Sequence, residues 1–372
     1  MSDKLFKTGI LSDTEIAELF NAKIINVSEK LTNDQIQPAS LDLRLGRKAW
    51  RVRSSFLPGS KNKVRNKISR LSMHEIDLSK GAVLEKGCVY IAEIMENLDL
   101  PENISASANP KSSTGRLDIF TRLIADNATE FEFVKSGYKG PLYIEISPRT
   151  FSVLVYEGSR LNQIRFRSGN YLLNDEEIKE LHKNISLISG YDGSLDIKDG
   201  IPLSIDLSGM TEGLIGYRAR KHTDLIDIQN IKFYKKEAFW EKVTTNDLTS
   251  DGLVLNPDEF YILASKEFVV IPETHAAEMR AYDTRVGEFR AHYAGFFDPG
   301  FGLVEGKLSN TRAVLEVRSH DVPFLIEQGQ TVCRLIYERM SSLPKKVSVS
   351  YTHLRAHETP EHRVLRVVGV KK

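Results

Sequence analysis

The sequence predicts an all-β protein built from two tandem copies of one domain, with a few short helices. Residues 83–166 form short runs rich in β-branched and aromatic residues, separated by Gly, Pro and Asn, which is the pattern of strands joined by turns. Residues 254–337 have the same character. Subtracting 171 from positions in the second half superposes it on the first without a gap, and Glu316 then falls on Glu145. A match of this length indicates an internal duplication.

Two short helices are expected outside the strand-rich runs. Ser12 with Glu15 three residues on is a capping-box pattern, and apolar residues follow at helical spacing. This predicts a helix over residues 11–22. A second helix is expected over residues 171–184, between the two copies.

The first strand and its repeat set the expected domain limits. Apolar and polar residues alternate over residues 38–46, as in a strand with one buried face. Residues 202–209 repeat this pattern one residue shorter. We therefore expect copy 1 over residues 1–170, copy 2 over residues 171–346 and a tail over residues 347–372.

The bulk composition is that of an ordinary globular protein, with 41% hydrophobic and 27% charged residues. The net charge of +1 is too small to make the whole chain a polyanion binder. Cys88 and Cys333 lie far apart in apolar runs, which predicts core thiols in a reducing compartment. No apolar run approaches the roughly 20 residues that span a membrane, and the N-terminus has no signal-peptide pattern. We expect a cytoplasmic protein without a membrane partner.

The segment from Leu43 to His74 contains ten Lys or Arg residues and no acidic residue. One interpretation is a solvated hairpin or loop. The other is a positive rim that attracts polyphosphate or nucleic acid. The segment lacks the interleaved aromatic residues of a nucleic-acid platform, so we expect no nucleic-acid partner.

The stretch around Lys111 has the composition of a phosphate site. Ser112 and Ser113 lie between Lys111 and Arg116, and Gly115 allows the backbone to approach a ligand closely. Hydroxyls and backbone N–H groups can donate to phosphate oxygens, and Arg can bind them bidentately. The alternative is that the two serines form a solvent-exposed turn.

Glu145 is the candidate acid/base. It lies in a run of β-branched and aromatic residues, where a carboxylate is costly to bury unless it is partnered or used. The alternative is a strand carboxylate satisfied by an ion pair with an Arg. Glu316 is the matching carboxylate in copy 2, where a structural role is the alternative.

Copy 2 has lost the phosphate pattern. The aligned positions carry Tyr282, Asp283, Thr284 and Gly287 in place of the basic and hydroxyl residues. An Asp at such a position would repel phosphate. Copy 2 has instead an Asp-Pro-Gly-Phe-Gly turn that begins at Asp298.

The tail has an unusual sequence. Residues 349–359 read VSYTHLRAHET, which matches the translation of an adapter used in sequencing libraries. We interpret residues 347–372 as adapter-derived, and the alternative is an ordinary basic tail. The histidines of this tail, at positions 353, 357 and 362, are therefore left out of the site.

Taken together, these motifs resemble the deoxycytidine triphosphate (dCTP) deaminases, a branch of the deoxyuridine triphosphatase-like barrels. The resemblance is to the long bacterial type with two fused copies, and it covers most of residues 11–340. It rests on the opening helix, the Lys-Ser-Ser-x-x-Arg motif and the Tyr-x-Gly hairpin that leads to Glu145. Residues 38–46, with Asp42, and the later strand, with Gln163, add to it.

The resemblance implies two tandem distorted jelly-roll barrels and hydrolytic deamination of dCTP to dUTP and ammonia without zinc. Glu145 would be the general acid/base, and the carbonyl of Ala125 would help to hold the attacking water. The triphosphate, with Mg²⁺ bridging its oxygens, would be bound by Lys111, Ser112, Ser113, Arg116, Gln163 and Asp42.

The resemblance also implies threefold assembly into a homo-oligomer and, in many members, inhibition by dTTP. Family sites lie between barrels, so Asp298 and Glu316 of copy 2 could contribute. Copy 1 departs from the family, because residues 127–136 replace the Asp-Pro-Gly-aromatic turn. The closing C-terminal arm of the family is not recognisable either.

The zinc deaminases need His-x-Glu and Pro-Cys-x-x-Cys, and neither motif occurs, so this class is excluded. Two alternatives stay open. One is a dUTP diphosphatase or a bifunctional enzyme, although the diphosphatase needs an Asp before the Tyr-x-Gly turn and residues 132–137 contain none. The other is a non-catalytic nucleotide-binding scaffold. For single residues, Asp42 could anchor a loop and Gln163 could be a polar residue at a strand edge.

Overall fold

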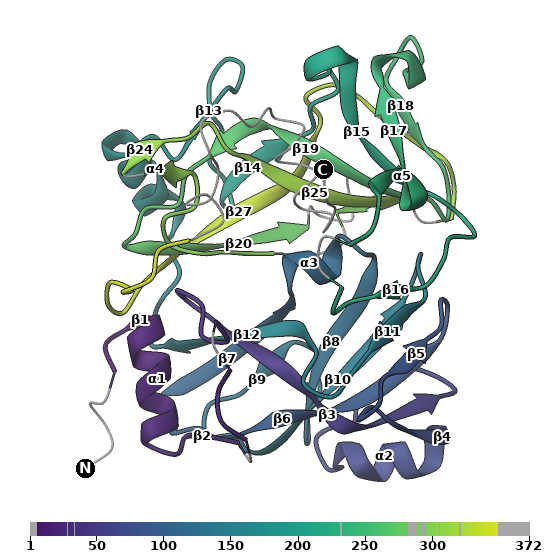
Figure 1. Cartoon of the computed structure of the whole chain (residues 1–372). Coiled ribbons are helices and arrows are strands. Elements are labelled where there is room, and N and C mark those ends of the chain that lie inside the picture. The colour runs from purple at the N-terminus through teal and green to yellow at the C-terminus, as the bar shows by residue number, and fades with distance from the viewer. Residues whose placement is uncertain are drawn as a thin grey trace. The chain divides into compact units, whose positions relative to one another are not determined.

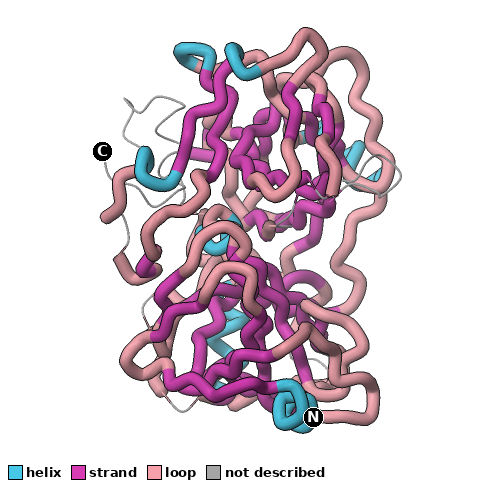
Figure 2. Tube along the Cα trace, turned by 90° about the vertical axis from the view of Figure 1, so that its right-hand side faces the viewer, coloured by secondary structure: helices cyan, strands magenta, loops and turns pink. Residues whose placement is uncertain are grey.

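The computed structural model describes most of the chain. The described residues are 6–27, 29–32, 34–230, 233–281, 289–291, 295–304, 306–319 and 321–348. The predicted tail lies outside them from residue 349 on. The chain folds into two compact units, and strands dominate both of them (Figures 1 and 2). Unit 1 consists of Met1–Tyr171, Asp224–Asn230 and Arg339–Lys346, and unit 2 consists of Leu172–Thr223, Ile231–Glu338 and Val347–Lys372.

Unit 1 is built around a ten-stranded sheet. Its strands are β1 (Gly9–Ile10), β2 (Ile25–Asn26), β3 (Leu41–Val52), β4 (Ser72–Asp77), β6 (Val89–Asp99), β7 (Ile104–Pro110), β8 (Ile119–Ala125), β9 (Phe133–Val134), β10 (Lys139–Pro148) and β12 (Arg160–Ser168). The main path runs β8-β10-β6-β3-β12-β7-β9. Because β8 also contacts β7, β9 and β12, the path curls into a nearly closed barrel. A second sheet joins β5 (Ala82–Leu84), β11 (Val153–Val155) and β16 (Ile226–Asp227).

Three short helices accompany these strands: α1 (Asp13–Asn21), α2 (Val64–Leu71) and α3 (Ser112–Gly115). The predicted opening helix is confirmed, and the Ser12 N–H donates to the Glu15 carboxylate at 2.9 Å, as the capping-box pattern predicted. The basic segment after Leu43 folds as strand, helix and strand (β3, α2 and β4) (Figure 1). The interpretation as a solvated hairpin fits, because Arg47 forms an exposed ion pair with Asp77 at 2.9 Å.

Unit 2 has the same all-β character. Its strands are β13 (Ile188–Ser189), β14 (Ile201–Ser204), β15 (Leu214–Ala219), β17 (Trp240–Thr244), β18 (Leu253–Leu255), β19 (Phe260–Val269), β20 (His275–Ala281), β21 (Phe289–Ala291), β22 (Phe296–Phe297), β23 (Leu303–Val304), β24 (Lys307–Leu308), β25 (Arg312–Ser319), β26 (Phe324–Ile326) and β27 (Thr331–Arg339). Its larger sheet has the main path β17-β15-β19-β25-β21, and a second sheet has the order β14-β27-β20-β22. Its helices are α4 (Asp175–Asn184) and α5 (Lys236–Phe239), with 3₁₀ turns at Thr211–Gly213 and Thr245–Asp247.

The two units repeat the same strands at the offset found in the sequence. β6 begins at Val89, and β19 begins at Phe260, which is the position that this offset predicts. The same offset relates β7 to β20 and β12 to β27. It also relates the paired strands β5 and β11 to the paired strands β18 and β26. Within these strands Glu145 faces Ile91, and Glu316 faces Ile262. The all-β fold class and the duplicated strand pattern predicted from the sequence are therefore present in the structure.

The prediction of a gapless superposition is wrong between the end of β7 and the start of β10. Ile119 and Phe289 occupy the same place in their sheets, but their separation is one position shorter than the offset. Val134 and Phe297 also correspond, and their separation is shorter still. The original offset returns in β25, after the β23–β24 hairpin of unit 2. Three changes in segment length cancel one another here, because the separation falls twice and then returns to the original offset. Surface loops tolerate such changes readily.

The prediction that residues 202–209 repeat residues 38–46 is also wrong. Leu43 pairs with Asn162, and Leu203 pairs with Cys333, which is the counterpart of Asn162 at the common offset. β14 therefore takes the place of the first residues of β3, and the counterpart of Asp42 is Pro202. The two Pro-containing segments look alike, but strand pairing and not local composition fixes their place in the sheet.

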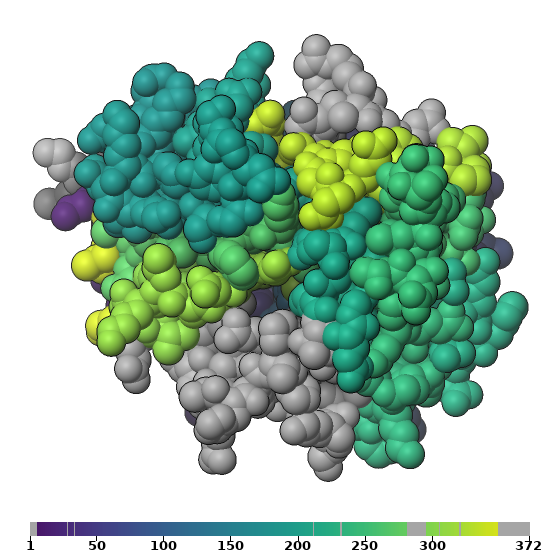
Figure 3. Space-filling view, turned by 90° about the horizontal axis from the view of Figure 1, so that it is seen from above, coloured from purple at the N-terminus to yellow at the C-terminus, as the bar shows by residue number. Residues whose placement is uncertain are grey.

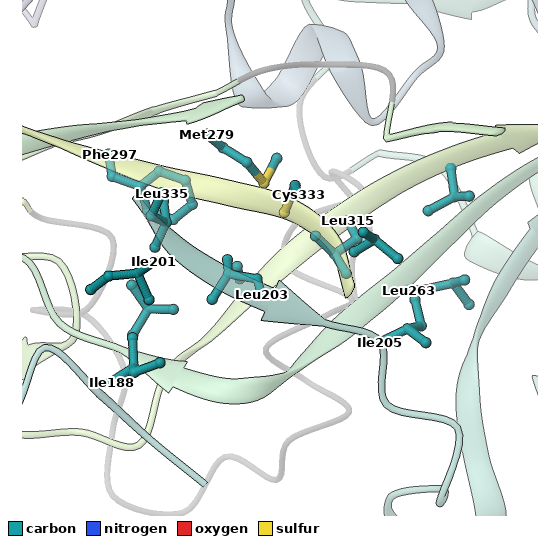
Figure 4. Close-up of a cluster of buried hydrophobic side chains, with 14 of the residues drawn as sticks. Ile188, Ile201, Leu203, Ile205, Leu263, Met279, Phe297, Leu315, Cys333 and Leu335 are labelled. Carbon is teal, nitrogen blue, oxygen red and sulfur yellow. The ribbon is translucent and has the colours of Figure 1, made fainter. Parts of the chain in front are cut away.

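The core of unit 2 is a large cluster of buried aliphatic side chains, ten of which are labelled in Figure 4. Cys333 lies within it, and burial raises the pKa of its thiol. Cys88 is only half-buried, because it lies in the turn before β6, so the prediction of a core thiol is wrong there. The teal surface in Figure 3 belongs to the segment that opens unit 2, and it packs beside the green and yellow-green surface of later residues of the same unit.

Across the residues that the structure describes, none of the helices is both long and apolar enough to span a membrane.

Candidate functional site

Glu145 lies in the middle of the unit 1 sheet, where β10 has β8 on one side and β6 on the other. Its cross-strand neighbours are Arg122 and Ile91. Only 2% of the residue is exposed. Arg122 donates to Glu145 Oε1 twice, from Nη2 at 2.6 Å and from Nε at 3.1 Å. Oε2 is buried and has no hydrogen-bond partner among the described residues.

The face of the sheet that carries Glu145 is covered by α2. Tyr143 is two positions before Glu145 on β10 and therefore points to the same face. It belongs to an apolar cluster with Ile91, and α2 contributes Val64 and Ile68 to the same cluster. Glu145 thus adjoins an apolar region, where a buried oxygen without a partner is costly. Such costs are typical of functional positions.

Arg122 is itself held by two further segments of unit 1. Its Nη2 donates to Ser55 Oγ at 2.7 Å. Its guanidinium carbon lies 3.6 Å from the ring centroid of Phe131 and 4.9 Å from that of Phe120. Planar stacking on aromatic faces restricts the guanidinium while leaving its N–H groups available in the plane. The ion pair with Glu145 is therefore fixed from several sides.

The predicted phosphate motif forms the turn between β7 and β8. Ser112 opens α3, and the side chains of Ser112 and Ser113 are exposed. Lys111 occupies the N-cap position in extended conformation, and Arg116 occupies the C-cap. The short turn therefore presents two hydroxyls to solvent between two basic residues, which is compatible with phosphate binding.

Asp42 is the buried anchor of this motif. Only 1% of it is exposed, and its carboxylate contacts Lys111 Nζ and, at 3.4 Å, Arg160 Nη1. Burial raises the pKa of Asp42 above its ordinary value of 3.8, although the charges of Lys111 and Arg160 act in the opposite direction. Gln163 lies directly opposite Asp42 on β12, and its amide donates to Pro110 O at 3.4 Å. Asp42, Lys111 and Gln163 thus lie close together in unit 1, and their binding of substrate stays a prediction.

The structure does not join all of the predicted residues. In the main sheet, β6 and β3 separate the strand of Glu145 from that of Gln163. Ala125 lies opposite Leu142, three positions along β10 from Glu145. Within the described part of unit 1, the Glu145–Arg122 pair and the Asp42–Lys111 pair share no hydrogen-bond partner. Unit 1 therefore carries two separate groups, one with the buried carboxylate and one with the hydroxyl and basic motif.

The residues predicted for copy 2 lie in unit 2. Glu316 is buried on β25, with 5% exposure. Asp298 is half-buried in a turn, where the Phe301 N–H donates to its carbonyl at 3.1 Å. Residues 282–288, which align with the phosphate motif, lie outside the described residues. A contribution of Asp298 or Glu316 to the site of unit 1 stays a prediction.

Sequence reasoning missed Arg122 and Arg160, the cations that contact the two buried carboxylates. Each lies far from its carboxylate in the chain, so no local motif links Arg122 to Glu145 or Arg160 to Asp42. A signal existed only for Arg122, because a lone Arg in the β-branched strand before the hairpin needs a partner when that strand is internal.

Among the described residues, no group of three or more His, Cys, Asp or Glu side chains is placed to hold a metal ion.

Comparison with known proteins agrees with this arrangement. The family model for the 2'-deoxycytidine 5'-triphosphate deaminase (DCD) N-terminal domain matches residues 7–170, and that for the C-terminal domain matches residues 174–355. A crystal structure of 2'-deoxycytidine 5'-triphosphate deaminase from Agrobacterium tumefaciens is 54% identical, with a TM-score of 0.85. The match covers 91% of this chain and 97% of that one.

Two curated relatives match over less of the chain. The dUMP-forming dCTP deaminase of Coprothermobacter proteolyticus is 32% identical over 160 residues, which is 42% of this chain and 81% of the relative. The dCTP deaminase of Haemophilus ducreyi is 28% identical over 142 residues, which is 36% of this chain and 70% of the relative.

The fold and the site define a duplicated β-barrel protein whose first unit keeps a buried strand carboxylate and a basic Ser-Ser motif. The matches over both units then identify the family. The chain belongs to the 2'-deoxycytidine 5'-triphosphate deaminase family.

Proposed function

We propose that this protein hydrolyses the amino group of dCTP to give dUTP and ammonia. Membership of the dCTP deaminase family over both units supports this activity. The observation that carries the residue assignment is the state of Glu145, which is buried, held through Oε1 and without a partner at Oε2 among the described residues. A carboxylate in this state can exchange a proton with a ligand without first releasing another hydrogen bond.

In the proposed reaction, water attacks C4 of cytosine, a C–O bond forms and the C–N bond to the amino group breaks. Glu145 takes one proton from the attacking water and passes it to N3, and it then carries the second proton from the new hydroxyl on C4 to the leaving amine. Ala125 would assist through its carbonyl, which is an expectation from the family. Buried carboxylates suit such transfers because they carry protons between donor and acceptor at short distance.

The phosphate end of the substrate is assigned to the motif around α3. Ser112 and Ser113 would donate to phosphate oxygens, and Lys111 and Arg116 would balance their charge. Gln163 and Asp42 would position Lys111, since Asp42 contacts it directly. Mg²⁺ would arrive on the triphosphate, and oxygen ligands of the phosphates would bind it.

The test measures products. Purified protein is incubated with dCTP and Mg²⁺, and dUTP, dUMP and ammonia are quantified by chromatography beside the Glu145→Gln variant. We expect wild-type protein to form dUTP and ammonia, and the variant to lose about 10²–10⁴-fold in rate, because Gln cannot carry the proton.

Glu130→Gln is the matched control, since it makes the same change at an exposed residue of unit 1. Full activity of Glu145→Gln would remove Glu145 from the mechanism. Nucleotide binding without turnover by wild-type protein would favour the non-catalytic scaffold instead.

A second candidate is a bifunctional enzyme that forms dUMP. The relative from Coprothermobacter proteolyticus is named as dUMP-forming, which favours this alternative. Appearance of dUMP and pyrophosphate in place of dUTP, at the same rate as ammonia, would establish it.

We further propose a cytoplasmic enzyme that assembles as a homo-oligomer, with threefold symmetry, and that dTTP inhibits. The assembly and the inhibition are supported by the family resemblance alone, and the compartment is supported by the cysteine usage of the sequence. Light scattering after size-exclusion chromatography gives the number of chains, and titration of dTTP into the deamination assay tests inhibition.

A further inference from the structure

We propose that Arg122 is the positioning residue of the deamination site, which holds Oε1 of Glu145 so that Oε2 faces the reacting atoms. This inference rests on the proposed function. Its starting point is the asymmetry of the ion pair, in which both contacting nitrogens of Arg122 meet the same oxygen, at 2.6 and 3.1 Å. A carboxylate held by one oxygen has a defined orientation for the other.

Because the ion pair is largely buried, it fixes the orientation of the Glu145 carboxylate. Glu145 is 2% exposed on its side chain and Arg122 is 27% exposed. A carboxylate in the interior of a sheet cannot reorient without losing a charge-assisted hydrogen bond. Rotation of Glu145 by half a turn about its last bond would exchange the two oxygens, and both guanidinium contacts would have to re-form. The arrangement therefore restricts the carboxylate without occupying Oε2.

Further contacts hold the side chain of Arg122 in place. Phe131 stacks on its guanidinium at 3.6 Å, and Ser55 accepts from Nη2 at 2.7 Å. Ser55 lies in the segment after β3, and Phe131 lies in the loop after β8. Together with Glu145 on β10, three parts of unit 1 therefore hold the side chain of Arg122. An ion pair that served only to neutralise a strand carboxylate would not need this support, and it would be expected to satisfy both oxygens.

The experiment compares Arg122→Gln, Arg122→Lys and the control Arg149→Gln. Arg149 is exposed and lies 5.8 Å from the Phe120 ring that Arg122 also approaches, so it matches charge and neighbourhood. We expect Arg122→Gln to lower kcat about 100-fold, because a small misplacement of a catalytic group has that effect, with little change in KM. Arg122→Lys should recover part of the rate, and Arg149→Gln should match wild type.

A double variant separates positioning from other roles. If Arg122 acts through Glu145, Arg122→Gln should reduce the residual rate of Glu145→Gln by less than threefold, as expected for residues that work as one unit. If Arg122→Gln lowers the rate of Glu145→Gln by as large a factor as it lowers the rate of wild type, the proposal is overturned. A loss confined to KM, or equal activity of all single variants, would do the same.

A readout without turnover distinguishes this proposal from the proposed function. The side-chain carboxyl of Glu145 can be followed by ¹³C NMR in the free protein and assigned through Glu145→Gln. Its chemical shift at a single pH should change in Arg122→Gln, because both hydrogen bonds to Oε1 are lost, and should change less in Arg122→Lys. If wild-type protein releases no ammonia, the proposed function fails. An unchanged chemical shift in both variants overturns the role of Arg122 regardless of turnover.

Discussion

Two of the buried carboxylates of unit 1, Glu145 and Asp42, differ in how their charge is balanced. Glu145 faces a guanidinium that is itself stacked and tethered. Asp42 is met by Lys111 and, at longer range, by Arg160, and burial still raises the pKa of Asp42. One Asp42 oxygen, Oδ1, has no partner among the described residues. Asp42 therefore anchors the phosphate motif at a cost in stability.

The cost at Asp42 predicts a particular pH dependence. Because its pKa is raised from 3.8 on folding, the folded state binds a proton more tightly than the unfolded state. Its contribution to stability is then greatest below 3.8 and falls as pH rises through the raised pKa. Asn at position 42 does not titrate. We expect the free energy of unfolding of wild type, minus that of Asp42→Asn, to fall as the pH rises above 3.8.

Urea unfolding of both proteins over this range provides the measurement. Asp13→Asn serves as a comparison, because Asp13 is another buried carboxylate of unit 1 that receives backbone N–H groups. A difference between wild type and Asp42→Asn that grows with pH would show that the contact with Lys111 outweighs burial.

The sequence identifies the carboxylates of the site but not their cations. Glu145 stands out because a charged residue interrupts an apolar strand pattern, and Asp42 stands out in the same way. Arg122 and Arg160 depend on strand order and register, which bring together residues that are distant in the chain. Such pairing follows from tertiary structure and leaves no local trace.

At the level of elements, β3 and β6 are joined by a buried ion pair. Arg44 Nε donates to Glu96 at 2.8 Å, and the side chains are 3% and 0% exposed. In unit 2 the corresponding residues are Ser204 and Glu267, and Ser204 donates to the carboxylate from its N–H at 2.8 Å and from its hydroxyl at 2.5 Å. The carboxylate has kept its place in both units while its partner changed.

This comparison predicts the result of two substitutions at Arg44. Arg44→Ala leaves Glu96 buried without its cation and should destabilise unit 1 by about 3–5 kcal/mol. Arg44→Ser introduces the solution found in unit 2, and its hydroxyl should recover about 1–2 kcal/mol of that loss. Denaturant unfolding of the full chain compares them. Equal stability of the two variants would show that the Ser204 arrangement does not transfer to unit 1.

The strands also explain why a gapless comparison of the two halves of the sequence misaligned part of the duplication. Strands keep the common offset because side chains must alternate between core and solvent. Between β7 and β10 the loops shortened and lengthened by amounts that cancel, so a gapless comparison finds good agreement at both ends. The aligned partners inside that interval are then misassigned, as Ile119 and Phe289 demonstrate.

For the whole molecule, the main feature is that unit 1 is completed by two later parts of the chain. Residues 224–230 add β16 beside β11, and Arg339–Lys346 returns to α1. There the backbone N–H groups of Lys345 and Lys346 donate to Asp13 at 2.9 and 3.0 Å. Ser342 donates to Glu15 at 2.8 Å. The first helix of the unit is thus capped by its last residues.

Truncation tests this dependence. A chain ending at Arg339 keeps all of β27 but lacks the segment that reaches α1. We expect faster hydrogen exchange in α1 and a lower melting temperature of unit 1, because Asp13 and Glu15 lose their hydrogen-bond partners in this segment. A chain ending at Ser348 is the control and should exchange as the full chain does. Unchanged exchange of α1 in the shorter chain would show that the return segment contributes nothing.

The return of Arg339–Lys346 to α1 has a consequence for biosynthesis. The ribosome synthesises the chain up to Tyr171 well before it synthesises residues 339–346, which contact α1. At usual rates of translation the delay is on the order of ten seconds or more. During that time the nascent first barrel must persist without the contacts of residues 339–346 to α1 and with β11 unpaired on the side that β16 later occupies. The part of the protein that is made first therefore gains its last contacts only after nearly all of unit 2 has been made.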